Sequence, residues 1–330
     1  MVVPASSLSS TVSAPSRPRL GQWTRYAGLL AVLVAMCALF GVLSEHFLTM
    51  ASFSTIANQI PALAVMAVGM TFVLIIGGID LSVGSVLAFC GAIMSVAVVQ
   101  WGWNLPAGIA LALASGLLCG AFTGSISVVL GIPSFIVSLG MLEIARGGAY
   151  SATGSRTEYI GGNVSMITDP LIGQISPAFV LALGIVLLGH ILLNRTVFGR
   201  HLIGIGTNEE AMRLAGINTH PPKVAVFMLM GVLSAVGSLF QVARMEAADP
   251  NAGVGMELSV IAAVVIGGTS LMGGRGSVLA SFFGVLIIAV LESGLAQIGA
   301  SEPTKRIITG LVIITAVVLD MYRSGRARRA

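Results

Sequence analysis

Long apolar runs recur along the whole chain and constrain its fold more than any other feature. Hydrophobic residues make up 56% of the 330 positions, and only 9% carry a charged side chain, against about 25% in ordinary soluble domains. A soluble fold of this length needs a charged exterior, whereas a bilayer requires only that backbone polar groups are satisfied inside helices. The composition therefore predicts an integral membrane protein with an all-α fold, a polytopic transmembrane helix bundle.

A window of roughly 19 residues indicates about ten membrane spans. The first apolar run is too long for a cleavable signal and no A-x-A pattern follows it, so we expect it to be retained as a span. An even number of spans puts both termini on one side. The expected spans lie near residues 26–43, 56–76, 81–99, 106–130, 133–150, 178–193, 224–243, 257–272, 277–298 and 305–321.

Basic residues gather in three segments, and their placement predicts the topology. The tail before the first span holds three Lys or Arg residues, the tail after the last span four and the 194–223 loop four, which makes 11 of the 17 in the chain. With ten spans, all three segments fall on one side, which the positive-inside rule makes cytoplasmic. We therefore expect a disordered, basic cytoplasmic tail over 1–25, a transmembrane domain over 26–321 and a second basic cytoplasmic tail over 322–330. The residues counted are Arg17, Arg19, Arg25, Arg195, Arg200, Arg213, Lys223, Arg323, Arg326, Arg328 and Arg329.

Motifs for catalysis or cofactor binding are not evident in the sequence. No G-x-x-x-x-G-K-[ST] loop occurs, and "GGRGS" at 273–277 lacks the lysine that reaches phosphates. The three cysteines form no C-x-x-C pair and the four histidines are scattered, so no metal site is expected. The net charge of +4 belongs to the cytoplasmic rim, where basic residues meet anionic lipid head groups, and needs no nucleic acid to explain it. We expect no enzyme and no cofactor in this chain.

Ionisable residues inside the apolar runs are few, and each is a functional candidate because charge is costly in a bilayer. The acidic candidates are Asp80, Glu143 and Glu292, and Arg146 follows Glu143 by three residues, a spacing at which a helix lets the two pair. No chain of carboxylates suggests a proton path. That argues against a proton-coupled carrier, whereas sodium-coupled carriers use backbone carbonyls and escape the argument.

Two stretches begin with a glycine pair and lead into a fresh apolar run: "GGIDLSVGSVLA" at 77–88 and "GGTSLMGGRGSVLA" at 267–280. One interpretation is a tight turn between consecutive spans, with Asp80 or a serine capping the next helix. The other is a pair of broken helices beside a translocation path, since interrupted helices in both halves mark the working region of transporters. The path candidates are Gly77, Gly78, Asp80, Ser82, Gly267, Gly268 and Ser270.

The cytoplasmic loop contains "GRHLIGIGTNEEAMRLAGI" at 199–217. We expect a glycine-containing turn at 204–206, an N-cap at Asn208, acidic residues in the first helical turn and a stop at Gly216. This pattern predicts a short, exposed, capped helix. Such a helix either docks on a partner protein or lies on the membrane surface.

Five blocks in order resemble the permease subunits of bacterial ABC sugar importers of the ribose, xylose, arabinose and galactose type. The resemblance covers about residues 50–321 and rests on "GGIDLSVGSVLA", "GIPSFIVSLGM" at 131–141, "TNEEAMRLAGI" at 207–217, "AVVIGGTSLMGGRGS" at 263–277 and "ITGLVIITAVVLD". It implies an inner-membrane permease, paired with a second copy, served by ATP-binding subunits that hold ATP and Mg and by a periplasmic sugar-binding protein.

The same resemblance implies that the 194–223 loop couples the permease to its ATPase. The residues that match the coupling block are Asn208, Glu209, Ala211, Arg213, Gly216 and Ile217. The expected cargo is a monosaccharide, either pentose, hexose or a related polyol. The alternative is an ion-coupled secondary transporter of a small polar solute.

Overall fold

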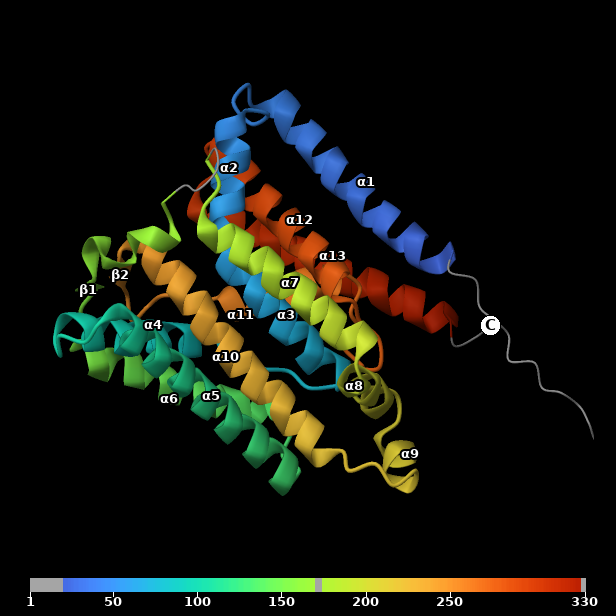
Figure 1. Cartoon of the computed structure of the whole chain (residues 1–330). Helices are drawn as coiled ribbons and strands as arrows, with labels where there is room; N and C mark the ends of the chain where they lie inside the picture. The colour runs from blue at the N-terminus through green and yellow to red at the C-terminus, as the bar shows by residue number, and fades with distance from the viewer. Residues whose placement is uncertain (1–19, 170–173, 328–330) are drawn as a thin grey trace, which may run out of the picture.

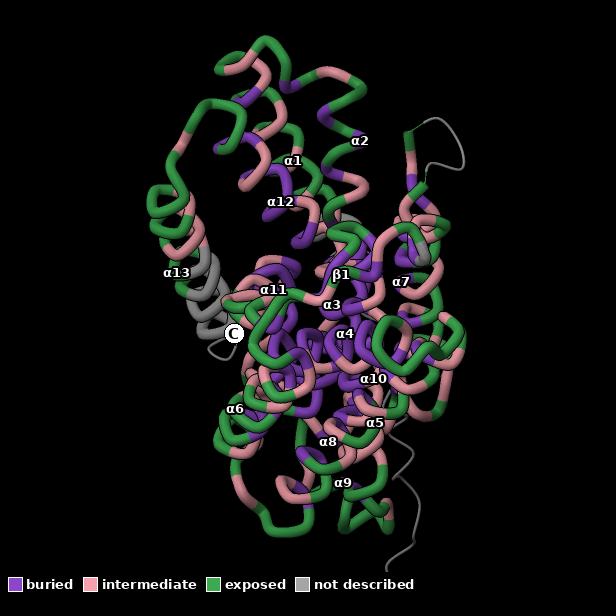
Figure 2. Tube along the Cα trace, turned by 90° about the vertical axis from the view of Figure 1, so that its left-hand side faces the viewer, coloured by how far each residue is buried: buried purple, intermediate pink, exposed green. Residues whose placement is uncertain are grey.

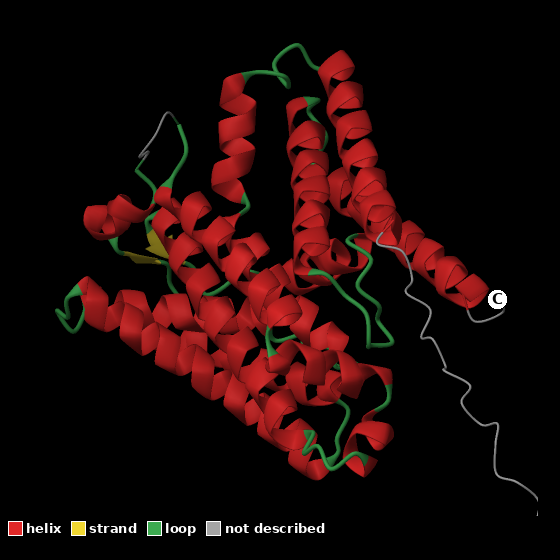
Figure 3. Ribbon diagram, turned by 45° about the vertical axis from the view of Figure 1, so that its right-hand side comes forward, coloured by secondary structure: helices red, strands yellow, loops and turns green. Residues whose placement is uncertain are grey.

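The computed structural model of the chain describes residues 20–169 and 174–327. These residues are almost entirely helical, and two short strands pair at one edge of the bundle (Figure 3). The helices are α1 (Leu20–Leu43), α2 (Met50–Gln59), α3 (Pro61–Ile75), α4 (Val83–Val99), α5 (Leu105–Leu130), α6 (Ser134–Thr153), η1 (Gly161–Ile167), α7 (Pro177–Arg195), α8 (Val197–Thr207), α9 (Glu209–Leu214), α10 (His220–Met245), α11 (Met256–Ile266), α12 (Val278–Gln297) and α13 (Glu302–Ala327). Strands β1 (Glu158–Tyr159) and β2 (Ala247–Ala248) are antiparallel.

Every expected span contains helix, and the all-α prediction is confirmed. Among the described residues, five helices are long and apolar enough to cross a membrane alone, and the α2–α3 pair makes a sixth. The expected span 56–76 is bent by 48° between α2 and α3, because Pro61 opens α3 and has no backbone N–H to continue α2. The helices α4 and α11 are shorter apolar helices.

The first and last helices extend into the segments expected as tails. Helix α1 begins at Leu20, so residues 20–25 are helical and continuous with the first expected span. Helix α13 continues to Ala327 and includes most of the expected second tail. The rest of the two tails lies outside the described residues.

Helix α3 forms the centre of the bundle, with 14 of its 15 residues buried. It packs against α7, α10, α11 and α12, and the buried segments in Figure 2 gather around these helices. Helix α1 lies outside this core, with only 6% of its apolar window buried. An apolar helix with so little burial suits a lipid-facing position.

Figure 1 shows how the loops and chain ends are distributed. The start of α1 and the end of α13 lie on the right of the view and α8 and α9 at its lower right, whereas β1 and β2 lie at its left edge. Helix α10 connects these regions, because it begins after α9 and ends just before β2.

Candidate functional site

Helix α9 has the exposed, capped form that the sequence predicts. The Asn208 side chain accepts a hydrogen bond from the backbone N–H of Ala211 at 3.0 Å, which confirms the predicted N-cap. Gly216 has a φ of 80°, and the N–H of Ile217 donates to the carbonyl of Met212, so the helix ends where expected. No residue of α9 is buried, and Leu214 is 82% exposed.

The expected turn at 204–206 is wrong, because these residues belong to helix α8. The side chain of Thr196 caps α8 by accepting from the N–H of Gly199. Leu202 and Ile205 are buried on the inner face of α8. Tertiary packing therefore overrides the low helix propensity of the two glycines.

Glu209 joins α9 to the start of α10. Its carboxylate accepts a hydrogen bond from the Thr219 hydroxyl at 2.8 Å, and its Oε2 lies 3.0 Å from Nζ of Lys223. Partial burial acts to raise the pKa of Glu209, but the hydrogen bonds from Lys223 and Thr219 and the nearby charge of Arg213 outweigh it and lower the pKa. The short helix is thus tied to a long one by a charged contact.

Helix α8 meets the end of α3 and the second glycine-led stretch at one backbone junction. The N–H of Gly274 donates to the carbonyl oxygen of Ile75 at 2.8 Å, which joins the 267–277 loop to the end of α3. Gly206 lies against this hydrogen bond, and a Cβ there would overlap the Ile75 oxygen and lie 2.5 Å from the Gly274 nitrogen. Sequence reasoning missed this junction, since the glycines that form it come from distant segments.

The two glycine-led stretches share the same helix-ending geometry. Gly77 and Gly268 have φ values of 76° and 79°, a conformation that glycine adopts without strain. Two hydrogen bonds close each end: Gly77 to Leu74 and Gly78 to Val73 after α3, and Gly268 to Val265 and Thr269 to Val264 after α11. This pair of hydrogen bonds is the Schellman arrangement. The glycine with positive φ is the first of its pair after α3, Gly77, and the second of its pair after α11, Gly268. Gly267 is the C-cap of α11 and keeps helical backbone angles.

Asp80 lies before the start of α4 and is only 3% exposed. Of the two expected caps, a serine, Ser82, holds the N-cap position, and its side chain makes no capping hydrogen bond. Instead, Oδ1 of Asp80 accepts from the backbone N–H of Ser82 at 2.9 Å and from its hydroxyl at 2.6 Å. The carboxylate therefore holds the turn before α4 from a position two residues ahead of the N-cap.

The backbone on either side of Asp80 is bound to α6. The N–H of Ile79 donates to Ser134 at 2.9 Å, and the N–H of Leu81 donates to Ser138 at 3.0 Å. In the second stretch Ser270 bonds within its own loop, through its N–H to the carbonyl of Arg275 at 2.9 Å. The first stretch is thus held across helices, whereas Ser270 closes a local turn.

Helix α6 also holds an irregular segment between β2 and α11. The expected pair of Glu143 and Arg146 is wrong: no ion pair joins them, and the Arg146 guanidinium donates to the carbonyl oxygens of Pro250 and Ala252. One turn on, the Tyr150 hydroxyl donates to Oδ1 of Asn251 at 2.6 Å. Sequence reasoning passed over this segment, although its "ADPNAGVG" composition is typical of irregular backbone.

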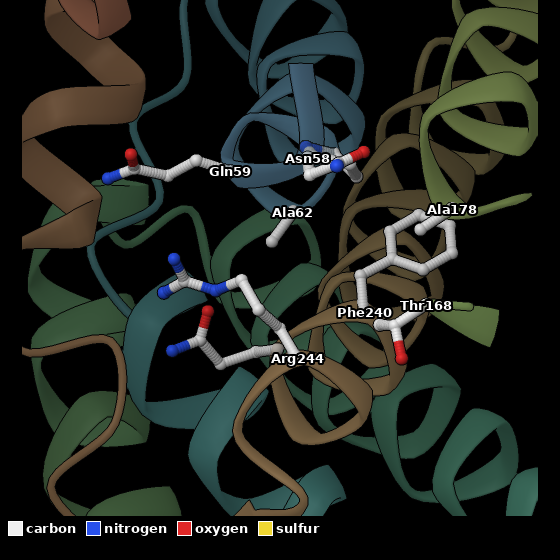
Figure 4. A pocket seen from close by; sticks show the side chains of 9 residues that line it. Asn58, Gln59, Ala62, Thr168, Ala178, Phe240 and Arg244 are labelled. Atoms are coloured by element: carbon white, nitrogen blue, oxygen red, sulfur yellow. The ribbon is translucent and has the colours of Figure 1, made fainter. Parts of the chain in front are cut away.

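Two cavities lie near the end of α10. The smaller measures about 10 Å³, about the size of one water molecule. It lies at the break between α2 and α3, and Figure 4 shows Gln59 and Arg244 among the side chains that surround it. The larger measures about 320 Å³ and lies between α4, α10 and the 247–252 segment, at the lower end of the size range for small-molecule sites.

Comparison with known proteins identifies relatives along nearly the whole chain. The ribose import permease RbsC of Escherichia coli strain K12 is 37% identical over 305 residues, which cover 90% of this chain and 94% of the relative. The L-arabinose ABC transporter permease AraH of Azospirillum brasilense is 31% identical over 330 residues, which cover 96% and 94%. The fructose import permease FrcC of Rhizobium meliloti is 33% identical over 304 residues, which cover 89% and 84%. No solved structure matches the chain.

A family model, described as the permease component of the branched-chain amino acid transport system, matches residues 52–317. The match includes both glycine-led stretches, the α8–α9 region and the irregular segment held by α6. The chain belongs to this family of transport permeases.

Proposed function

We propose that this chain is the membrane permease of an ATP-driven monosaccharide importer, and that a partner ATP-binding subunit drives it through α8 and α9. The relatives named above import ribose, arabinose and fructose, which favours a sugar over the amino acids of the family description. The observation that carries the proposal is the junction at Gly206. There α8 touches the backbone at the end of α3, two residues before the first glycine-led stretch, and the backbone of the second stretch.

The proposed assembly contains a second permease copy, ATP-binding subunits that hold ATP and Mg, and a periplasmic sugar-binding protein. We place the chain in the bacterial inner membrane, with ten spans and both termini in the cytoplasm. The arrangement in Figure 1 supports this topology, because the start of α1, the end of α13 and α9 lie toward the same part of the molecule.

Force from the ATPase reaches the membrane interior by two routes. Helix α9 is fastened to the start of α10 through Glu209 and Lys223, so a displacement of α9 moves α10. Helix α8 is packed against Ile75 and Gly274, so the same displacement moves the end of α3 and the 267–277 loop. The second route consists of backbone contacts without an intervening flexible side chain, so small shifts of α8 are passed on with little loss.

Two glycines on α8 give a matched pair of variants for testing this proposal. A Cβ at Gly206 meets backbone atoms, whereas a Cβ at Gly204 lies 2.6 Å from the sulfur atom of Met212, near the end of a flexible side chain. We expect Gly206→Ala to lower sugar uptake per inserted permease at least tenfold while ATP hydrolysis by the assembled transporter continues. Gly204→Ala should retain both activities.

The measurement uses vesicles that contain the permease, its ATPase and its binding protein, with uptake and hydrolysis followed in parallel. Equal uptake by the two variants would remove the junction from the coupling route. A parallel loss of hydrolysis and uptake in Gly206→Ala alone would show a defect in assembly, and would also contradict the proposed role.

A further inference from the structure

The larger cavity lies between three segments of the chain, one of which, α10, also belongs to the proposed coupling route. Leu87, Ala88 and Gly91 of α4 form one wall, and Val242 and Met245 of α10 form a second. The third wall is the chain from β2 to Ala252, and Thr157 and Tyr159 lie at the rim. We propose that this cavity is a monosaccharide contact site on the permease itself. The proposal rests on the sugar-import function argued above.

The polar groups of the cavity match the chemistry of a sugar. Thr157, Tyr159 and Gln241 each offer both a donor and an acceptor, as sugar hydroxyl groups also do. Within the described residues, the side chains of these three residues make no hydrogen bond to the protein. Oδ1 of Asp249 accepts hydrogen bonds from the backbone N–H and the side-chain amide of Asn251. Its second oxygen, Oδ2, is left as an acceptor for a ligand.

The charge of the lining favours a neutral polyol over an amino acid. Asp249 is the one charged side chain among the residues that line the cavity. A zwitterionic ligand needs a cationic partner for its carboxylate and loses affinity where that partner is missing. A neutral ligand with several hydroxyl groups requires only hydrogen bonds and an apolar surface for its C–H groups, and the α4 wall supplies that surface.

Two residues of α6 fix the wall that carries Asp249. Arg146 holds the carbonyls of Pro250 and Ala252, and Tyr150 holds the side chain of Asn251. Pairing of β1 with β2 places Tyr159 opposite Ala247 and fixes the rim. Arg146 and Tyr150 are therefore positioning residues, whereas Gln241 and Asp249 are the proposed contacts.

Helix α10 connects this cavity to the coupling region. Its first turn contains Lys223, the partner of Glu209, and its last turns contribute Gln241, Val242 and Met245 to the cavity. Movement of α9 is therefore transmitted along one helix to the wall of the proposed sugar site. Release of a weakly held sugar would follow from the same displacement that opens the path.

Protection of a cysteine in the cavity tests the proposal without relying on transport. Thr157→Cys is introduced into the complete transporter in vesicles, and its labelling rate by an impermeant maleimide is measured with D-ribose, L-arabinose, D-fructose or L-leucine at equal concentration. We expect at least one sugar to slow labelling threefold or more, with no effect of leucine. Adding Gln241→Ala should abolish the protection, whereas the matched Gln59→Ala, at the small cavity, should not.

Protection that is equal for sugars and leucine, or that survives Gln241→Ala, would overturn the proposed site. So would weaker binding of the periplasmic protein to the Gln241→Ala variant with unchanged sugar protection, because the cavity would then be a docking surface. ATP-dependent uptake by the same vesicles is recorded separately. Loss of protection with normal ATP-dependent uptake contradicts only the site, whereas absence of ATP-dependent uptake contradicts the function on which it rests.

Discussion

The Nζ atom of Lys223 lies 3.0 Å from Oε2 of Glu209 and joins the short helix α9 to the first turn of α10. The contact is partly exposed, with 22% and 35% of the two side chains accessible, so its contribution to stability is small. The contact matters for geometry, because it holds α9, a helix without a buried residue, against the 26-residue helix α10.

Neutralising Glu209 should separate ATP hydrolysis from transport. Glu209→Gln loses the ion pair with Lys223 and weakens the contact with Thr219, so we expect sugar uptake per ATP hydrolysed to fall severalfold. Glu210→Gln is the matched control, because Glu210 is exposed on the same turn. Both ratios are measured in vesicles with the partner subunits, and equal ratios would contradict the coupling role of Glu209.

The pH dependence of this contact has a defined sign. The pKa of Glu209 is lowered in the folded protein, so its stabilising effect is present above the unfolded pKa, about 4.3. It is lost as the pH falls through the folded value. The difference in thermal stability between the native chain and Glu209→Gln should therefore stay constant from pH 6 to 8 and shrink only in acid. A difference that disappears near neutral pH would contradict the assignment.

Asp80 should tolerate asparagine better than alanine. The side chain introduced by Asp80→Asn keeps an oxygen that accepts from Ser82, whereas alanine leaves buried donors unsatisfied, at a cost of about 1–3 kcal/mol. We expect Asp80→Asn to retain at least half of the uptake per inserted protein and Asp80→Ala to lose most of it. An asparagine variant as defective as the alanine variant would show that the charge of Asp80 is itself required in the translocation path.

Arg146 should matter more than Arg244, although both lie on helices that approach the larger cavity. Arg146→Met keeps an apolar stem but loses both bonds to the 250–252 backbone. Arg244, which lines the small cavity, makes no hydrogen bond or ion pair with the described residues. We expect Arg146→Met to reduce uptake at least fivefold with normal insertion, and Arg244→Met to reduce it less than twofold. The reverse order would contradict the role given to the irregular segment.

Impermeant cysteine labelling tests the ten-span topology. In a background without native cysteines, Thr157→Cys should be labelled from the outer face of intact cells and Arg200→Cys only after permeabilisation. Thr157 lies beside β1, and Arg200 lies on α8. Labelling of Arg200→Cys from outside would require an odd number of spans before α8 and would overturn the topology.

Local patterns predicted local structure well in this chain. The N-cap at Asn208 and the stop at Gly216 confirm the predicted helix, because capping depends on residues within one turn. The glycines at 204–206 misled the same reasoning, since packing against α3 and the 267–277 loop keeps them helical. A pattern of glycines alone does not distinguish a turn from a close contact between backbones.

Features that depend on distant segments were predicted poorly. The pairing of Glu143 with Arg146 was predicted from helix spacing. The Arg146 guanidinium instead donates hydrogen bonds to the carbonyls of Pro250 and Ala252, more than a hundred residues away. The glycine-led stretches were recognised as special, whereas the junction of Gly206 with Ile75 and Gly274 was not, because no local signal reports which chain segments approach each other. The roles of the path candidates stay predictions.

Uptake into vesicles with a defined energy source tests the central claim most directly. Vesicles that contain the permease and its ATPase are loaded with ATP and Mg, supplied outside with the binding protein and labelled sugar, and compared with vesicles that have a sodium or proton gradient but no ATP. The account predicts uptake with ATP that persists when both gradients are collapsed, and none with a gradient alone. Uptake driven by either gradient without ATP would contradict it and would identify the chain as an ion-coupled carrier.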